Sequence, residues 1–130
     1  MGLFSRKPKP EAAAPVETGP TPERLAELDA EIVDLQQQLG AADADGRSAL
    51  LDRLGAAERA RGDLDAAIGH FEASLAEREV YGPAYHALLE LFEAKRSAAA
   101  TAKDREGLDR WIARIDDHMA VSKRILRSNY

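Results

Sequence analysis

From residue 23 onwards, large apolar residues recur at alternating intervals of three and four positions, which is the period of an α-helix. The first such segment carries this spacing at Leu25, Leu28, Ile32, Leu35 and Leu39. No segment alternates β-branched and polar residues in the period of two that is typical of a strand. The sequence therefore predicts an all-α protein.

Start and stop signals divide this region into about five antiparallel helices. Thr21, Pro22 and Glu23 combine a hydroxyl N-cap with proline at the first helical position, and Gly40 is a typical C-terminal stop. The predicted helices cover residues 23–39, 47–61, 64–75, a segment that starts near residue 83, and 104–128, with the small-residue stretch 97–103 joining the last two.

Each predicted helix has an apolar side that is expected to form the core. On the last helix this side combines seven residues. The expected core comprises Leu50, Leu51, Leu54, Ala57, Leu64, Ala67, Ile68, Phe71, Leu75, Tyr85, Leu88, Leu89, Phe92, Leu108, Trp111, Ile112, Ile115, Met119, Ile125 and Leu126.

Residues 1–22 differ in composition from the rest of the chain. Five of its six prolines fall within residues 7–22, where there is almost nothing apolar to bury, so residues 1–22 are expected to be a disordered tail before one helical domain, 23–130. Residues 1–9 contain two apolar residues and three cations, which suit at most a weak contact with an acidic membrane. No apolar run is long enough for a signal or a spanning segment, so we expect a cytoplasmic location.

Composition and spacing also limit the chemistry. The 130 residues include no cysteine, and the net charge of −5 argues against general nucleic-acid binding. Residues 41–52 are similar to a calcium loop, but Ala41 takes the place of its first carboxylate and Asp52 that of its bidentate glutamate, which favours a capped turn. His70, His86 and His118 have no evident nucleophile as a partner, so no enzyme activity, metal or cofactor is expected.

The sequence also repeats itself with a period of 34 residues. An Ala-x3-Phe pattern, at Ala67 and Phe71, lies between the two copies. In the copies, Leu51, Leu54 and Gly55 correspond to Tyr85, Leu88 and Leu89, and Glu58 corresponds to Phe92.

This pattern resembles the tetratricopeptide repeat family, whose unit is a 34-residue helix–turn–helix. Residues 48–81 are similar to one full repeat, and 82–96 to the first helix of another. The chain departs from the family at Glu58, where the pattern has tyrosine, and at Ser74, where a second small residue is usual. The apolar residues of segment 64–75 correspond to those of segment 108–119 in the last helix, which lie 44 residues later. Because the repeat period is 34 residues, this shift implies about ten inserted residues.

The resemblance implies a non-catalytic module that binds a peptide or protein partner, as a scaffold or adaptor, through a groove lined by the first helix of each repeat. A solvated surface without a ligand is the alternative interpretation of these positions. The implied groove residues are Asp52, Arg53, Ala56, Arg59, His86, Glu90 and Glu93, with Ala49, Ala60, Pro83, Ala87 and Ala94 beside them.

Two further features have competing interpretations. Arg61, Gly62 and Asp63 form a tripeptide that can act as an adhesion ligand on an exposed loop, but a Gly-Asp pair is common at the bend within a repeat, and Asp63 is a good helix cap. The Leu25–Leu39 stripe has coiled-coil spacing over about two heptads. A structural protein that forms homodimers through this stripe is therefore the alternative function.

Overall fold

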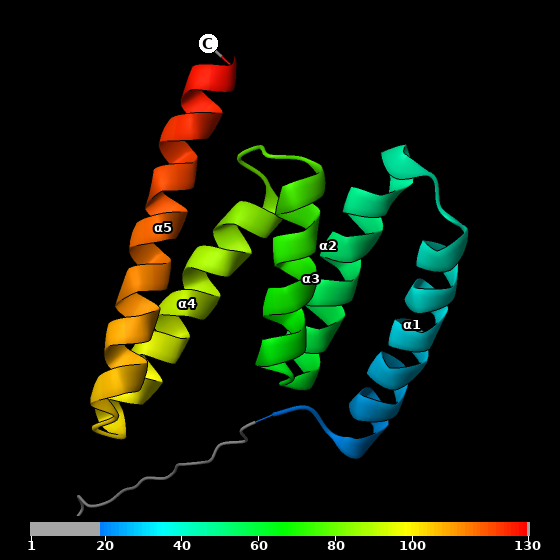
Figure 1. Cartoon of the computed structure of the whole chain (residues 1–130). Coiled ribbons are helices and arrows are strands. Elements are labelled where there is room, and N and C mark those ends of the chain that lie inside the picture. Colours follow the sequence, from blue (N-terminus) through cyan, green and yellow to red (C-terminus); the bar gives the residue numbers. More distant parts are fainter. Residues whose placement is uncertain (1–18, 130) are drawn as a thin grey trace, which may run out of the picture.

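The structure, a computed structural model, describes residues 19–129. This part of the chain contains five α-helices and no strand. The helices are α1 (Pro22–Ala41), α2 (Ala44–Arg61), α3 (Leu64–Glu77), α4 (Pro83–Thr101) and α5 (Arg105–Asn129). They form a row of antiparallel neighbours with α1 at one edge and α5 at the other (Figure 1). The predicted all-α array is confirmed, while most of the predicted tail, residues 1–18, lies outside the described residues.

Side chains cap the helices where the sequence indicated. The Thr21 hydroxyl accepts a hydrogen bond from the backbone N–H of Arg24 at 3.1 Å, with Pro22 in the first turn of α1. Gly62 ends α2 in the left-handed conformation, with φ of 97°, and the Asp63 carboxylate accepts from the N–H of Ala66 to begin α3. The tripeptide that begins at Arg61 is therefore the turn between α2 and α3.

Three predicted boundaries were wrong. Helix α1 continues through Gly40 to Ala41, because a glycine near a helix end is tolerated without being its stop. Helix α2 begins at Ala44, since Asp43 caps it by accepting from the N–H of Gly46 at 3.0 Å. The alanine-rich stretch after residue 96 extends α4 to Thr101, because alanine is the strongest helix former. Most of the inserted residues therefore lengthen α4.

Successive helices pack against each other in pairs, from α1 on α2 to α4 on α5. Leu28 and Leu35 of the predicted dimer stripe are buried in the contact of α1 with α2, so this stripe serves packing within the chain. The main core cluster lies further along the row. It comprises Ala67, Ile68, Phe71, Leu75, Ala84, Tyr85, Ala87, Leu88, Leu91, Phe92 and Ile125.

The expected core of α5 was wrong in part, although Trp111 and Ile115 do pack against the main core cluster. Of its seven predicted residues only Ile125 is buried, whereas Ile112, Met119 and Leu126 are 41%, 49% and 46% exposed. His118, which was not expected in the core, is only 5% exposed. The reason is that α5 ends the row and packs mainly against α4, so among the described residues no helix covers its other side.

Candidate functional site

The predicted groove residues come from α2 and α4, and the structure places part of this set around one hollow. The hollow has a volume of about 520 Å³ and lies between the two helices, above the ring of Phe71 from α3. We name it the α2–α4 groove. Its lining residues are Asp52, Ala56, Arg59, Ala60, Phe71, Pro83 and Ala87.

Small side chains create the space in the α2–α4 groove. Ala56 and Ala60 of α2 face the groove opposite Ala87 of α4, and none of them projects beyond its Cβ atom. Phe71 is buried beneath them, so the floor is apolar. A partner's apolar side chain would lose its hydration on entering this space, which is the main favourable contribution to association.

Charged groups lie along the rim. The guanidinium of Arg59 forms an ion pair with the Glu90 carboxylate on α4 at 2.8 Å, and this pair joins the two helices across the groove. The two side chains are 40% and 64% exposed, so the pair contributes little to stability and either charge can turn to a ligand.

A buried hydroxyl holds the position of Asp52. Ser74 of α3 is buried and donates from Oγ to Asp52 Oδ1 at 2.5 Å, while Ser48 Oγ lies 3.0 Å from the same hydroxyl. Ser74 is a polar residue at a position where the repeat pattern has a small core residue. This was the one sequence feature that could have indicated the hydrogen bond to Asp52. The sequence alone did not connect it with Asp52.

The remaining predicted residues do not line the groove. Arg53 and His86 are exposed on α2 and α4, and Glu93 pairs with Arg96 of its own helix at 2.8 Å. Glu90 reaches the rim through its ion pair with Arg59. Of the seven residues, the structure therefore brings Asp52, Ala56 and Arg59 into the groove directly.

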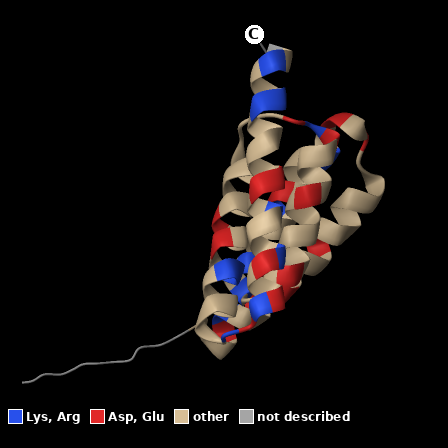
Figure 2. Ribbon diagram, turned by 60° about the vertical axis from the view of Figure 1, so that its left-hand side comes forward, with Lys and Arg blue, Asp and Glu red and all other residues tan. Residues whose placement is uncertain are grey.

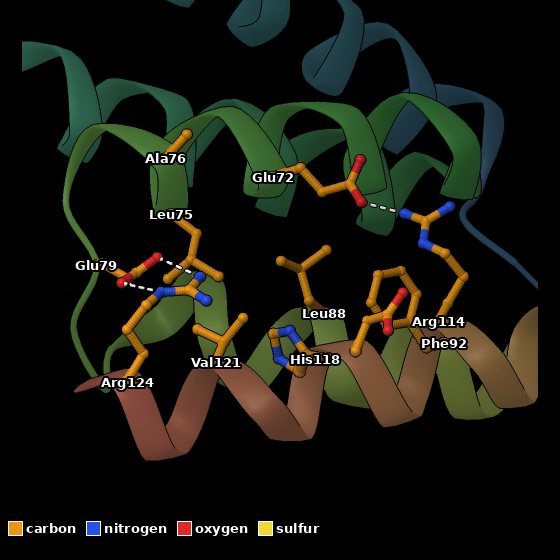
Figure 3. Close-up of a pocket in the computed structure, with 11 residues that line it drawn as sticks. Glu72, Leu75, Ala76, Glu79, Leu88, Phe92, Arg114, His118, Val121 and Arg124 are labelled. Atoms are coloured by element: carbon orange, nitrogen blue, oxygen red, sulfur yellow. Dashed lines mark hydrogen bonds and ion pairs between the residues drawn. The ribbon is translucent and has the colours of Figure 1, made fainter. Parts of the chain in front are cut away.

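A second hollow, of about 250 Å³, lies between α3 and α5 and was not predicted (Figure 3). Its apolar part includes Leu75, Leu88 and Phe92. Two ion pairs bridge its walls, Arg114 with Glu72 and Arg124 with Glu79 (Figure 3). The second pair has two hydrogen bonds, of 2.8 and 2.7 Å, through which Arg124 lowers the pKa of Glu79.

His118 forms part of the wall of this second hollow. Its Nε2 lies 2.8 Å from the carbonyl oxygen of Tyr85 and therefore carries a proton that it donates, and its ring stacks on that of Tyr85 at 4.3 Å. Burial lowers the pKa of His118, although the Tyr85 carbonyl opposes this effect. The neutral, stacked imidazole is typical of a core histidine. Within residues 19–129, no hydrogen bond joins it to Asp116 or Asp117.

Another buried ionisable group lies between α2 and α3. The carboxylate of Glu58, at the position where the repeat pattern has tyrosine, is 2.6 Å from Nδ1 of His70. Glu58 is buried and His70 is partly exposed, so the imidazole satisfies a carboxylate that would otherwise be costly to bury.

The described residues also bear on metal sites and on membrane spans. No group of three or more metal-ligating side chains is placed to hold an ion in this part of the chain. None of the helices described is long and apolar enough to cross a membrane.

Comparisons with protein-family models, with curated proteins and with solved structures gave no match to this chain.

Proposed function

We propose that this protein is a non-catalytic interaction module of the tetratricopeptide-repeat type, and that it binds a peptide segment of a partner protein in the α2–α4 groove. One observation carries the proposal: Asp52, Ala56 and Arg59 of α2 line the same hollow as Pro83 and Ala87 of α4, above the apolar ring of Phe71. The resemblance to the repeat family implied both sets as groove residues.

The groove suits a peptide with an apolar side chain between polar neighbours. Its volume of about 520 Å³ falls within the range of ordinary ligand sites. The apolar side chain would lie over Phe71 and the alanines, while Asp52 accepts a hydrogen bond and Arg59 or Glu90 pairs with a charge. Because the walls are helices, little ordering entropy is lost on binding.

A peptide-library selection tests the proposal without knowledge of the partner. The full chain would be used to select binding peptides, whose affinities for the Ala56→Phe variant would then be measured. The added ring fills the groove from an exposed position on α2, so binding should weaken by at least about tenfold, the equivalent of 1.4 kcal/mol.

Ala30→Phe is the matched control, because Ala30 is an exposed alanine in the middle of α1. The selected peptides should bind this variant as they bind the unaltered chain, and circular dichroism should show both variants folded. A library that returns no binding peptide, or peptides that bind Ala56→Phe undiminished, would contradict the proposal.

A further inference from the structure

Helix α5 carries apolar residues on two different sides. Trp111, His118 and Ile125, spaced seven apart, lie toward α4, where Trp111 contacts Phe92 and His118 contacts Tyr85. A second series follows the alternating intervals of four and three that characterise a coiled-coil seam. We name it the outer face of α5, and it comprises Leu108, Ile112, Ile115, Met119, Ser122 and Leu126.

The outer face of α5 remains open to solvent. Ile112, Met119 and Leu126 are three of the five large hydrophobic side chains that are exposed within the described residues, and they follow one another every seven positions. Leu108, Ile115 and Ser122, which lie between them, are half-buried, and Ile115 also packs against the main core cluster. The fully open part of this face is therefore the line of Ile112, Met119 and Leu126. An apolar strip of this length on a helix is typical of a contact surface.

The two ends of the helical row differ in this respect. At the other end, the outer side of α1 exposes acids and amides such as Glu27, Glu31, Asp34 and Gln38, with Val33 as its one large exposed hydrophobic residue. A terminal helix of an array normally has such a polar outer side. The α1 end therefore presents mainly polar side chains to solvent, while the α5 end presents an apolar surface.

Charge along α5 indicates which partner fits. In the heptad that places Ile112, Met119 and Leu126 at one core position, Asp109 and Lys123 occupy equivalent flanking positions, and both are exposed. An acidic residue therefore flanks the start of the outer face and a basic residue its end, with Asp116 between them. A second α5 that runs in the opposite direction brings Asp109 of each copy towards Lys123 of the other.

The apolar residues also match in that antiparallel arrangement. With the two-fold axis near Asp117, Leu108 meets Leu126 of the second copy and Ile115 meets Met119 of the second copy. The layer between these two pairs Ile112 with Ser122 of the second copy. Asp109 then lies opposite Lys123 of the second copy, twice by symmetry, while Asp116 lies near its own counterpart at the axis. In a parallel pair, the flanking charges would face positions that α4 already covers, such as His118 and Ile125.

We propose that two copies of this chain associate through the outer faces of their α5 helices, antiparallel and about a two-fold axis. The C-terminal turns of α5, which carry basic residues, extend past the other helices (Figures 1 and 2). A contact of one helix with one helix is smaller than a standard protein interface, so we expect a weak dimer that depends on protein concentration. This interaction is independent of peptide binding in the α2–α4 groove.

Sedimentation equilibrium on the full chain, from low to high micromolar concentration, tests this proposal. The mass should rise from the 14.2 kDa of the monomer towards twice that value. Met119→Lys places a charge in the central layer at an exposed position and should raise the dissociation constant at least about tenfold, while the thermal melt at monomeric concentration stays unchanged. Val33→Lys, at a residue that is 52% exposed on α1, is the matched control and should dimerise like the unaltered chain.

Charge exchange tests the orientation. Asp109→Lys alone and Lys123→Asp alone should each weaken the dimer, and the double variant should recover it, because only an antiparallel pair places these two positions opposite each other. A monomer at every concentration would overturn the proposal and assign the face to another occupant, such as a different protein or residues 1–18. A dimer that Met119→Lys leaves intact, or a double variant no stronger than the single ones, would overturn it equally.

Discussion

The ring of Phe71 on α3 lies directly against the backbone of Gly55 on α2. A methyl group built on Gly55 would lie 2.7 Å from one ring carbon and 2.8 Å from two others, closer than real side chains pack. The two residues come from the Leu-Gly and Ala-x3-Phe parts of the repeat pattern. Their contact explains the pattern physically, because α2 and α3 approach closely only where α2 lacks a side chain.

Gly55→Ala should therefore destabilise the protein even though alanine is the better helix former. The propensity gain is about 1 kcal/mol, but displacing the ring and the helices should cost about 1–3 kcal/mol, so we expect a net loss of up to about 2 kcal/mol. Urea unfolding followed by circular dichroism measures the difference. Gly69→Ala on α3 is the control: its Cβ would meet nothing within 4 Å, so it should stabilise the protein by about 0.5–1 kcal/mol. Equal stabilisation by both changes would disprove the close contact.

Phe71→Ala and Asp63→Ala should differ strongly in their effects. Removing the buried ring takes away the floor of the α2–α4 groove and part of the core, so it should cost about 3–5 kcal/mol. Asp63 caps α3 from an exposed position, so its loss should cost only about 1 kcal/mol. Thermal melts check both values, and two harmless changes would contradict the packing of α2 against α3.

Ser74→Ala should reveal how much the buried hydroxyl contributes. The change leaves Asp52 and Ser48 without their partner, and because both are partly exposed, water compensates in part. We expect a loss of about 1 kcal/mol in urea unfolding. Ser97→Ala, at an exposed position inside α4, should be neutral or slightly stabilising. If the two changes had the same effect, the Ser74 hydrogen bonds would contribute nothing to stability.

His118 should make stability depend on pH in the mildly acidic range. Burial lowers the pKa of His118 in the folded state below its ordinary value of 6.5, so the unfolded chain takes up the proton first as the pH falls. The contribution of neutral His118 is therefore complete above about pH 6.5 and is lost as the pH falls towards the folded-state pKa. Urea midpoints at about pH 7.5 and about pH 5.5 measure this loss.

The matched variants are His118→Gln, which keeps a donor for the Tyr85 carbonyl, and His86→Gln at an exposed position. The first should remove most of the pH dependence. The second should reduce it only slightly, because the charge of His86 is the smallest of the causes that act on the pKa of His118. A pH dependence that survives His118→Gln in full would show that another group carries it.

Local features of the fold could be predicted because their causes are local. The caps formed by Thr21 and Asp63, and the left-handed turn at Gly62, depend on residues within one helical turn of each other. Gly40 was misjudged for a related reason, since a glycine ends a helix only where the chain turns left-handed, and here the chain continues to Ala42 in an extended conformation.

The α2–α4 groove was partly predictable from the resemblance to the tetratricopeptide repeat family. That resemblance implied Asp52, Ala56 and Arg59 as residues of a groove shared with α4. It did not identify Ser74 as the support of Asp52, because a hydrogen bond between helices depends on their separation and rotation. The second hollow, beside His118, was missed for the same reason.

The sequence by itself determined that the chain forms helices and where most of them begin, because these properties follow from spacings of three and four residues and from local capping signals. Only the tertiary structure decided which apolar side of α5 is covered. Both sides have helical spacing, and burial depends on which neighbour is present in space: α4 takes the side of His118 and Ile125, and the side of Met119 stays open.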